Sequence, residues 1–366
     1  MAQPSSLVSK DYYSARQRFL SKAKASDATC RSAALSVKGP GDRDLFIDVA
    51  CLGNPNARKA LIHLSGVHGI EGFIGSGIQS VALCEGFVIP DDTALVFVHA
   101  LNPFGFAWLR RTNENNVDLS RNGLPADQFA VFAKKSYRRY SQISERLGIE
   151  RATFDSQAFA ESFARLTGEL GEAELKQALA GGQYAHPAGL FYGGTELQES
   201  YVVLRKLLRE CIGSVNSACA IDVHSGLGPK GLDSLLVEYG PNDTRFKWLS
   251  EAFPFRVMPL APNEGVAYRA SGLSFSWLEQ EFKAAKWYSF AQEFGTFPIP
   301  KVLSALIEEN VWHHNHEQED LDALCKANLK EMFCSSDPDW EAVVIDRGIL
   351  AIYRALKQIQ NQLPSA

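Results

Sequence analysis

Short apolar runs that alternate with helical stretches restrict the fold of this chain more than any other feature. The clearest runs lie at 45–52, 60–65, 94–101, 218–224, 234–239, 256–260 and 287–294. Most of them are continuously apolar, as strands buried on both faces should be. Stretches in which apolar residues have helical spacing lie between many of these runs, and others follow the last run. The alternation predicts an α/β fold in which a sheet carries helices on both faces.

The helical stretches define the expected organisation of the chain. With 366 residues and 46% hydrophobic content, the sequence can bury a substantial core, and no shift in composition marks a boundary. We therefore expect a single domain over 1–366, with a helical insertion at about 125–182 and a helical C-terminal tail at about 318–366. The insertion either packs on one face of the sheet or forms a lid over a site.

Composition also limits the partners. The net charge of -5, the pI near 6.0 and the absence of a long Lys/Arg run argue against nucleic acid. No apolar stretch reaches 18 residues and the N-terminus does not resemble a signal peptide, so we expect a cytoplasmic protein without a membrane partner. The seven cysteines lack CxxC spacing and are expected to be reduced, mostly buried thiols. The oligomeric state is not predicted.

A histidine and a glutamate three residues apart, His68 and Glu71, follow the run 60–65 where it ends in glycines before a helix. Such a pair can bind one Zn²⁺ if the chain turns between strand and helix and points both side chains into one cleft. With eight histidines, roughly one HxxE motif is expected by chance. Two further copies, at 314–317 and 316–319, lack this strand-end context, so only the first is a candidate metal site.

A third ligand is expected at the end of another apolar strand, where His224 ends the run 218–224. The carboxyl ends of neighbouring strands converge at one edge of an open sheet, so this side chain can enter the same cleft. Two histidines and one glutamate leave a fourth position for water, whose pKa zinc lowers from about 15.7 to about 7. Alternatively, His224 is a core histidine. His63 and His99 lie inside apolar runs and are predicted to be structural.

Further motifs accompany these candidates. Residues 102–105 read Asn-Pro-Phe-Gly, residues 111–122 follow R-x-N-x-x-x-V-D-L-x-R-N, and residues 222–226 read Asp-Val-His-Ser-Gly. After the HxxE motif, this ordered set resembles the zinc carboxypeptidase family (carboxypeptidase A-like metallopeptidases), particularly a bacterial branch near the aspartoacylase and succinylglutamate desuccinylase group. The resemblance covers roughly 40–310. It implies an α/β three-layer sandwich with a mixed central sheet.

The resemblance also implies roles for individual residues. One Zn²⁺ per chain would be held by His68, Glu71 and His224. Asp118 would not bind the metal itself; its carboxylate would orient His68 and fix the tautomer of that ligand.

Three arginines belong to the motif between the ligands. Arg121 matches the arginine that binds a substrate carboxylate, and Arg111, or its neighbour Arg110, matches the one that polarises the scissile carbonyl. The planar, permanently charged guanidinium suits both roles. Ser120 stands where the family usually has asparagine. The alternative is a solvated loop whose surface ion pairs contribute about 0 to 1 kcal/mol each.

A general base is expected on a late strand, and Glu293 fits because it is a lone acid near the end of the run 287–294. A buried carboxylate is usually paired or catalytic. In the family, such a glutamate accepts the proton of the water and delivers it to the leaving amine. Glu279 and Glu281 are rivals, but they lie in a polar stretch of helical character.

Glycines beside aromatic residues indicate loops that contact a ligand or form ordinary turns. Such segments occur at 181–187, 191–194 and 263–269. Among them, Tyr268 or Tyr192 would supply the mobile tyrosine that many relatives use to bind substrate.

The motifs together predict a zinc-dependent hydrolase that cleaves an amide bond next to a free carboxylate, with a small peptide or acyl amino acid as substrate. One alternative is an N-acyl amino acid amidohydrolase resembling aspartoacylase or succinylglutamate desuccinylase, which shares the metal set. Another is a non-catalytic binding module that retains the fold. Glu293 argues against the latter, because a binder needs no base.

Overall fold

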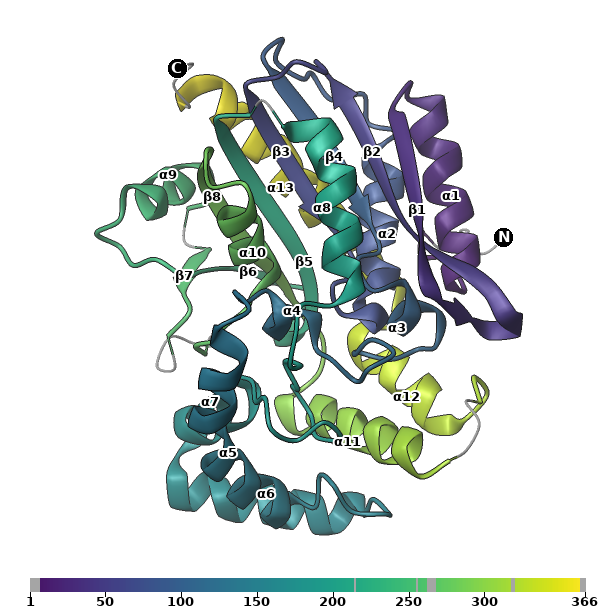
Figure 1. The fold of residues 1–366 in the computed structure, drawn as a ribbon, viewed down its shortest axis with the longest axis vertical. Coiled ribbons are helices and arrows are strands. Elements are labelled where there is room, and N and C mark those ends of the chain that lie inside the picture. The colour runs from purple at the N-terminus through teal and green to yellow at the C-terminus, as the bar shows by residue number, and fades with distance from the viewer. Residues whose placement is uncertain (1–6, 214, 255, 262–267, 317–319, 363–366) are drawn as a thin grey trace.

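The computed structural model describes residues 7–213, 215–254, 256–261, 268–316 and 320–362. Within these residues, eight strands form one sheet in the order β1-β2-β4-β3-β5-β8-β6-β7 (Figure 1). The predicted runs all form strands, and the sequence analysis missed only the edge strand β1, whose side chains are mostly exposed or half-buried. The strands are β1 (Thr29–Gly39), β2 (Arg43–Gly53), β3 (Lys59–Leu64), β4 (Thr93–His99), β5 (Ser217–Lys230), β6 (Asp233–Val237), β7 (Val257–Pro259) and β8 (Lys286–Gly295).

The centre of the sheet is parallel, which explains why its strands are apolar on both faces. β4, β3, β5 and β8 pair in parallel, whereas β2 and β6 join this group antiparallel. The sheet is therefore mixed, as predicted. The carboxyl ends of β3, β5 and β8 lie at one edge of the sheet, the lower edge in Figure 1.

Helices cover both faces of the sheet and confirm the three-layer α/β sandwich. One core lies between the sheet and α1, α2 and α13, and it includes Phe19 and Phe73. The opposite core lies under α8 and α10 and includes Tyr201 and Trp277. The helices are α1 (Tyr12–Ala25), α2 (Gly72–Ala82), α3 (Pro103–Ala107), α4 (Leu119–Asn122), α5 (Gln128–Leu147), α6 (Ser156–Leu170), α7 (Glu172–Ala180), α8 (Glu199–Ile212), α9 (Thr244–Ala252), α10 (Ser274–Glu281), α11 (Ile299–Asn315), α12 (Leu324–Phe333) and α13 (Pro338–Gln362).

The predicted helical insertion consists of α5, α6 and α7. These helices pack on one another, and α6 also packs on α11, so the insertion lies beyond the lower edge of the sheet in Figure 1 rather than on a face of it. The C-terminal tail behaves differently, because α13 returns to the sheet and buries Val344 and Ile352 in the core. No helix in the described part of the chain is long and apolar enough to cross a membrane.

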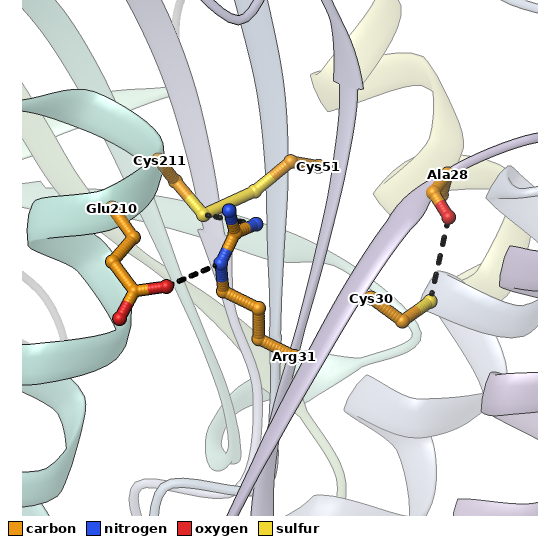
Figure 2. The surroundings of a disulfide bond; sticks show 6 residues. All are labelled: Ala28, Cys30, Arg31, Cys51, Glu210 and Cys211. Carbon is orange, nitrogen blue, oxygen red and sulfur yellow. Dashed lines mark hydrogen bonds and ion pairs between the residues drawn. A yellow bond between two sulfur atoms is a disulfide. The ribbon is translucent and has the colours of Figure 1, made fainter.

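The structure corrects the expectation that all cysteines are reduced. Cys51 on β2 and Cys211 on α8 form a disulfide across 160 residues of sequence, with Cα atoms 6.7 Å apart (Figure 2). Beside it, Arg31 of β1 donates to the Glu210 carboxylate at 2.7 Å and contacts the Cys211 sulfur at 3.8 Å. Spacing along the chain could not reveal this pair, because only the packing of α8 against β2 brings the two residues together.

Candidate active site

The turn after β3 carries the first two candidate ligands, and two other motifs hold it in place. The backbone N–H groups of Gly69 and Ile70 donate to the carbonyl oxygens of Arg111 and Arg110 at 3.1 and 2.8 Å. A Cβ atom on Gly69 would lie 2.1 Å from the carbonyl carbon of Gly105, so no larger residue fits there without a backbone shift. The Asn-Pro-Phe-Gly and arginine motifs therefore position the HxxE turn.

The three predicted ligands converge. The Nδ1 atom of His68 lies 2.9 Å from a Glu71 carboxylate oxygen and 3.1 Å from the Nδ1 atom of His224, which is 3.0 Å from the second Glu71 oxygen. All three residues are at most 5% exposed. In the described residues they are the one set of three such donors whose ligand atoms lie within 4.8 Å of one another. Glu317 and Glu319, which complete the other HxxE copies, lie outside the described residues.

A carboxylate contacts the outer nitrogen of each candidate histidine ligand. Asp118 lies 3.0 Å from Nε2 of His68, at the position predicted for the orienting carboxylate. Asp222, which the sequence analysis did not single out, lies 3.0 Å from Nε2 of His224 and accepts a hydrogen bond from Ser274. Such partners orient the imidazole rings so that both Nδ1 atoms face Glu71. The Nη2 atom of Arg111 also lies 2.7 Å from Nε2 of His68. The Asp-x-His spacing was the available signal, because residues two apart on a strand share a face.

Charges in the candidate centre favour a cation. Burial alone would raise the pKa of Glu71, but His68 and His224 hold it below its ordinary value. Burial likewise opposes ionisation of Asp118, yet Arg111 and His68 keep its pKa well below the usual range. Burial lowers the pKa of His224, but Asp222 raises it well above normal.

Glu293 faces the same space from β8, where it pairs in register with His224 on β5. One carboxylate oxygen, Oε1, accepts a hydrogen bond from the Leu227 backbone N–H at 2.9 Å. Burial, and then repulsion from Glu71, raises the pKa of Glu293 to about 7. Its rivals lie elsewhere, in ion pairs: Glu279 with Arg245 at 3.6 Å, and Glu281 with Arg205 at 2.8 Å.

The structure distinguishes the two adjacent arginines. Arg111 lines the cavity, with its guanidinium 3.1 Å from Asp118 and 3.2 Å from Glu71. Arg110 is fully buried outside the cavity lining and pairs with Glu309 at 2.9 Å, so its place is structural rather than at the predicted substrate position. Sequence spacing could not separate them, because the turn geometry decides which neighbour points inward.

Arg121 also lines the cavity, although it is only 1% exposed. It donates to the backbone carbonyls of Ala180 and Ser120 and, at 2.9 Å, to the Tyr268 hydroxyl. No carboxylate of the described residues lies within 4.0 Å of its guanidinium. A buried positive charge of this kind can bind a substrate carboxylate.

Aromatic residues complete the surroundings of the arginines. The Phe191 ring lies 5.2 Å from the Arg111 guanidinium carbon and 5.8 Å from that of Arg121. Tyr268 lines the cavity, whereas Tyr192 is buried in the core under α8 and α10. Residues 262–267, most of the predicted loop at 263–269, lie outside the described residues.

A cavity of about 330 Å³ is lined by the three candidate ligands together with Glu293, Arg111 and Arg121. Small-molecule sites are commonly concave, largely apolar and about 300 to 1,000 Å³ in volume. Most of the polar lining comes from the strand ends and the arginine motif, and α6 and α7 add Thr167, Glu172 and Lys176. The rest is mostly apolar. The polar and charged residues of the predicted site that line it are His68, Glu71, Arg111, Ser120, Arg121, His224, Tyr268 and Glu293.

The two histidines predicted to be structural lie apart from this cavity. His99 is fully buried. Its ring lies 3.0 Å from the Ser76 hydroxyl and 4.0 Å from Asp48, so serine, histidine and aspartate follow one another as in a catalytic triad. His63 is equally buried and contacts Gln79. None of these five residues lines the cavity. Without access for a substrate, these groups stabilise the core.

Comparisons with known proteins agree with the architecture. A structure of bovine thrombin-activatable fibrinolysis inhibitor in complex with tick carboxypeptidase inhibitor matches with 12% identity and a TM-score of 0.50, over 96% of this chain and 98% of that one. Carboxypeptidase A from Helicoverpa armigera matches at 12% identity and a TM-score of 0.42, over 94% and 74% of the two chains. Murein-tripeptide amidase MpaA from Escherichia coli O157 matches at 15% identity and a TM-score of 0.34, over 79% and 93%.

Among curated proteins, no sequence matches the chain. Residues 8–347 match the family described as "Protein of unknown function (DUF2817)". The structure with a TM-score of 0.50 shares the fold that the motif resemblance implies. The chain thus has the carboxypeptidase-like α/β fold and belongs to the DUF2817 family.

Proposed function

We propose that this protein is a zinc-dependent, carboxypeptidase-like hydrolase that cleaves an amide bond next to a free carboxylate, with residues 1–366 acting as a single domain. The observation that carries the proposal is the convergence of His68, Glu71 and His224 beside Glu293 in one buried cavity. The fold supports the same class of protein.

The donor set fits zinc. Two imidazole nitrogens and one carboxylate are ligands that Zn²⁺ prefers, and a set of three leaves a position for water or substrate. Asp118 and Asp222 support the two histidines from outside, as is usual for such ligands. A Zn²⁺ ion held there would lower the pKa of a water molecule toward about 7 and polarise a carbonyl group.

Glu293 would move the proton. Its Oε1 atom is held by the Leu227 N–H, which leaves Oε2 to take a proton from the attacking water and pass it to the nitrogen of the leaving amine. Its position in a largely apolar cavity, which raises its pKa, suits a group that must both accept and release a proton near neutral pH.

The arginines would bind the substrate. Arg121, steadied by Tyr268 and by the Ala180 carbonyl, would pair with the free carboxylate. Arg111 would donate to the oxygen of the scissile carbonyl and stabilise negative charge that develops on it. Their common contact with the Phe191 ring keeps the two charges on one side of the cavity.

The second candidate function is that of an N-acyl amino acid amidohydrolase. The observation that favours it is the position of α6 and α7, which line the cavity and restrict the room for a long peptide. A non-catalytic binding module is disfavoured by Glu293, which would have no role without a reaction.

Substrate profiling of the zinc-loaded protein tests the proposal. A mixture of short peptides with free C-termini and N-acyl amino acids would be incubated with the protein, and mass spectrometry would identify the cleaved amides. We expect cleavage of the amide bond next to the free carboxylate, and no cleavage after removal of the metal by a chelator. Lack of turnover on every amide in the mixture, with zinc bound, would contradict the proposal.

Arg121→Ala and amidation of the substrate carboxylate should each lower kcat/KM by about 30-fold or more. Truncating one partner of a desolvated Arg–carboxylate pair commonly costs about 2 to 5 kcal/mol. The two losses should not add, because both remove the same interaction. Kinetics of both proteins on free and amidated substrates measure this, with the exposed Arg209→Ala as a control. Equal rates on free and amidated substrates would instead indicate a zinc amidase or endopeptidase.

Asp222→Asn should lower the affinity for Zn²⁺ by about 10 to 100-fold, because His224 loses the carboxylate that orients it. Competition with a chromophoric chelator measures the affinity. Asp48→Asn replaces an equally buried aspartate that does not contact the candidate ligands, and it controls for general destabilisation. An unchanged affinity in Asp222→Asn would remove Asp222 from the supporting shell of the metal.

A further inference from the structure

Helices of the insertion form part of the cavity wall. Phe163 and Thr167 line the cavity from α6, and Leu175 and Leu179 line it from α7. In each helix the two residues are four positions apart, so they lie on one face. The insertion therefore contributes apolar side chains from two helices to the same space as the candidate catalytic groups, and α7 also places Glu172 and Lys176 in the lining.

A stripe of α11 continues this apolar surface. Its lining residues Ile299, Val302, Leu303 and Leu306 follow helical spacing, and α6 packs directly on this helix. The stripe and the inserted helices together make the cavity apolar away from the strand ends.

The charged lining residues of α7 occupy a different environment. Glu172 is exposed and Lys176 is half-buried, whereas Leu175 and Leu179 are 1% and 3% exposed. The interior side of the wall is therefore apolar, and charge is placed toward solvent. A charged substrate group placed against Phe163, Leu175 and Leu179 would lose its hydration without gaining a partner from these side chains.

We propose that α6 and α7 form a specificity wall, defined by Phe163, Thr167, Leu175 and Leu179, which selects small amide substrates that carry a large apolar group. This proposal rests on the proposed function for the identity of the scissile bond. The apolar group is either the acyl chain or the side chain of the released amino acid. A cavity of about 330 Å³ fits a small molecule rather than an extended peptide.

Matched substrate pairs test the wall in the zinc-loaded full-length protein. One pair, N-acetylphenylalanine and N-acetylalanine, varies the side chain, and the other, N-octanoylglycine and N-acetylglycine, varies the acyl chain. We expect the larger member of at least one pair to have a kcat/KM about 30-fold higher or more. In a fitted apolar pocket, one additional methylene group already changes kcat/KM by about 10-fold or more. N-acetylglutamate should be a poor substrate.

Variants of the wall link this preference to the insertion. The double variant Phe163→Ala/Leu179→Ala should lower the ratio of the two kcat/KM values by about 10-fold. Leu166→Ala is the matched control, because Leu166 is fully buried in the same helix but does not line the cavity, and the ratio should not change. Should the double variant not fold, Thr167→Phe adds bulk at a half-buried position and should slow the larger substrate selectively, by about 10-fold.

Binding without turnover separates this proposal from the proposed function. Calorimetry should show that the wild-type protein binds 3-phenylpropanoate at least about 10-fold more tightly than propanoate, and that the double variant loses this preference. If the preference is found but no amide is cleaved, the proposed function fails and the wall remains. If amides are cleaved with ratios that neither variant changes, or if acidic substrates are preferred, the specificity wall is refuted. If neither the binding preference nor amide cleavage is found, both the specificity wall and the proposed function are refuted.

Discussion

His68→Ala and His224→Ala are each expected to lose the bound metal and, with it, hydrolytic activity. Each variant removes one of three donors, and the two that remain are too few to hold Zn²⁺ firmly. Elemental analysis of the purified protein should therefore find about one zinc per chain in the wild type and much less in either variant. Circular dichroism establishes that the variants are folded.

His314→Ala provides the matched control for this experiment. His314 begins another HxxE copy, but it lies near the end of α11 and does not line the cavity. This variant should retain one zinc per chain and normal activity. Stoichiometric zinc in folded His68→Ala or His224→Ala would show that the ligands have been assigned incorrectly.

Glu293→Gln should lower kcat by about 10² to 10⁴-fold while zinc remains bound. Glutamine keeps the shape of the side chain and can still accept the Leu227 N–H, but it cannot take a proton from water. A loss in kcat with little change in KM would place the effect in the chemical step rather than in binding. Steady-state kinetics together with metal analysis measures both quantities.

Glu279→Gln is the control, because Glu279 is a partly buried glutamate that pairs with Arg245 outside the cavity. Its activity should stay close to that of the wild type. Near-normal turnover in Glu293→Gln would transfer the role of base to another group and would remove the main argument against a binding module.

Local sequence was sufficient to predict seven of the eight strands and most of the residues of the candidate site. Strands buried on both faces must be apolar along their length, so β3, β5 and β8 were visible as runs. Their carboxyl ends meet at one edge in any parallel sheet, so polar residues at those ends had to lie close together. For this reason His68, His224 and Glu293 could be grouped before the structure was known.

Edge and surface elements gave weaker signals. β1 alternates exposed and half-buried positions and was missed, because its backbone pairing with β2 rather than apolar burial makes it a strand. The insertion was recognised as helical from its spacing, but spacing does not tell which element a helix will pack on. Its position on α11, beside the cavity, follows from contacts between distant segments.

The α/β class, the buried strand runs and the strand ends that carry His68, His224 and Glu293 could be predicted from the sequence alone, because these depend on periodicity and on the geometry common to parallel strands. Tertiary structure decided between Arg110 and Arg111, paired Cys51 with Cys211 and brought the insertion to the cavity. These outcomes depend on which distant surfaces pack together and on the direction in which a turn points each side chain. No local pattern encodes either property.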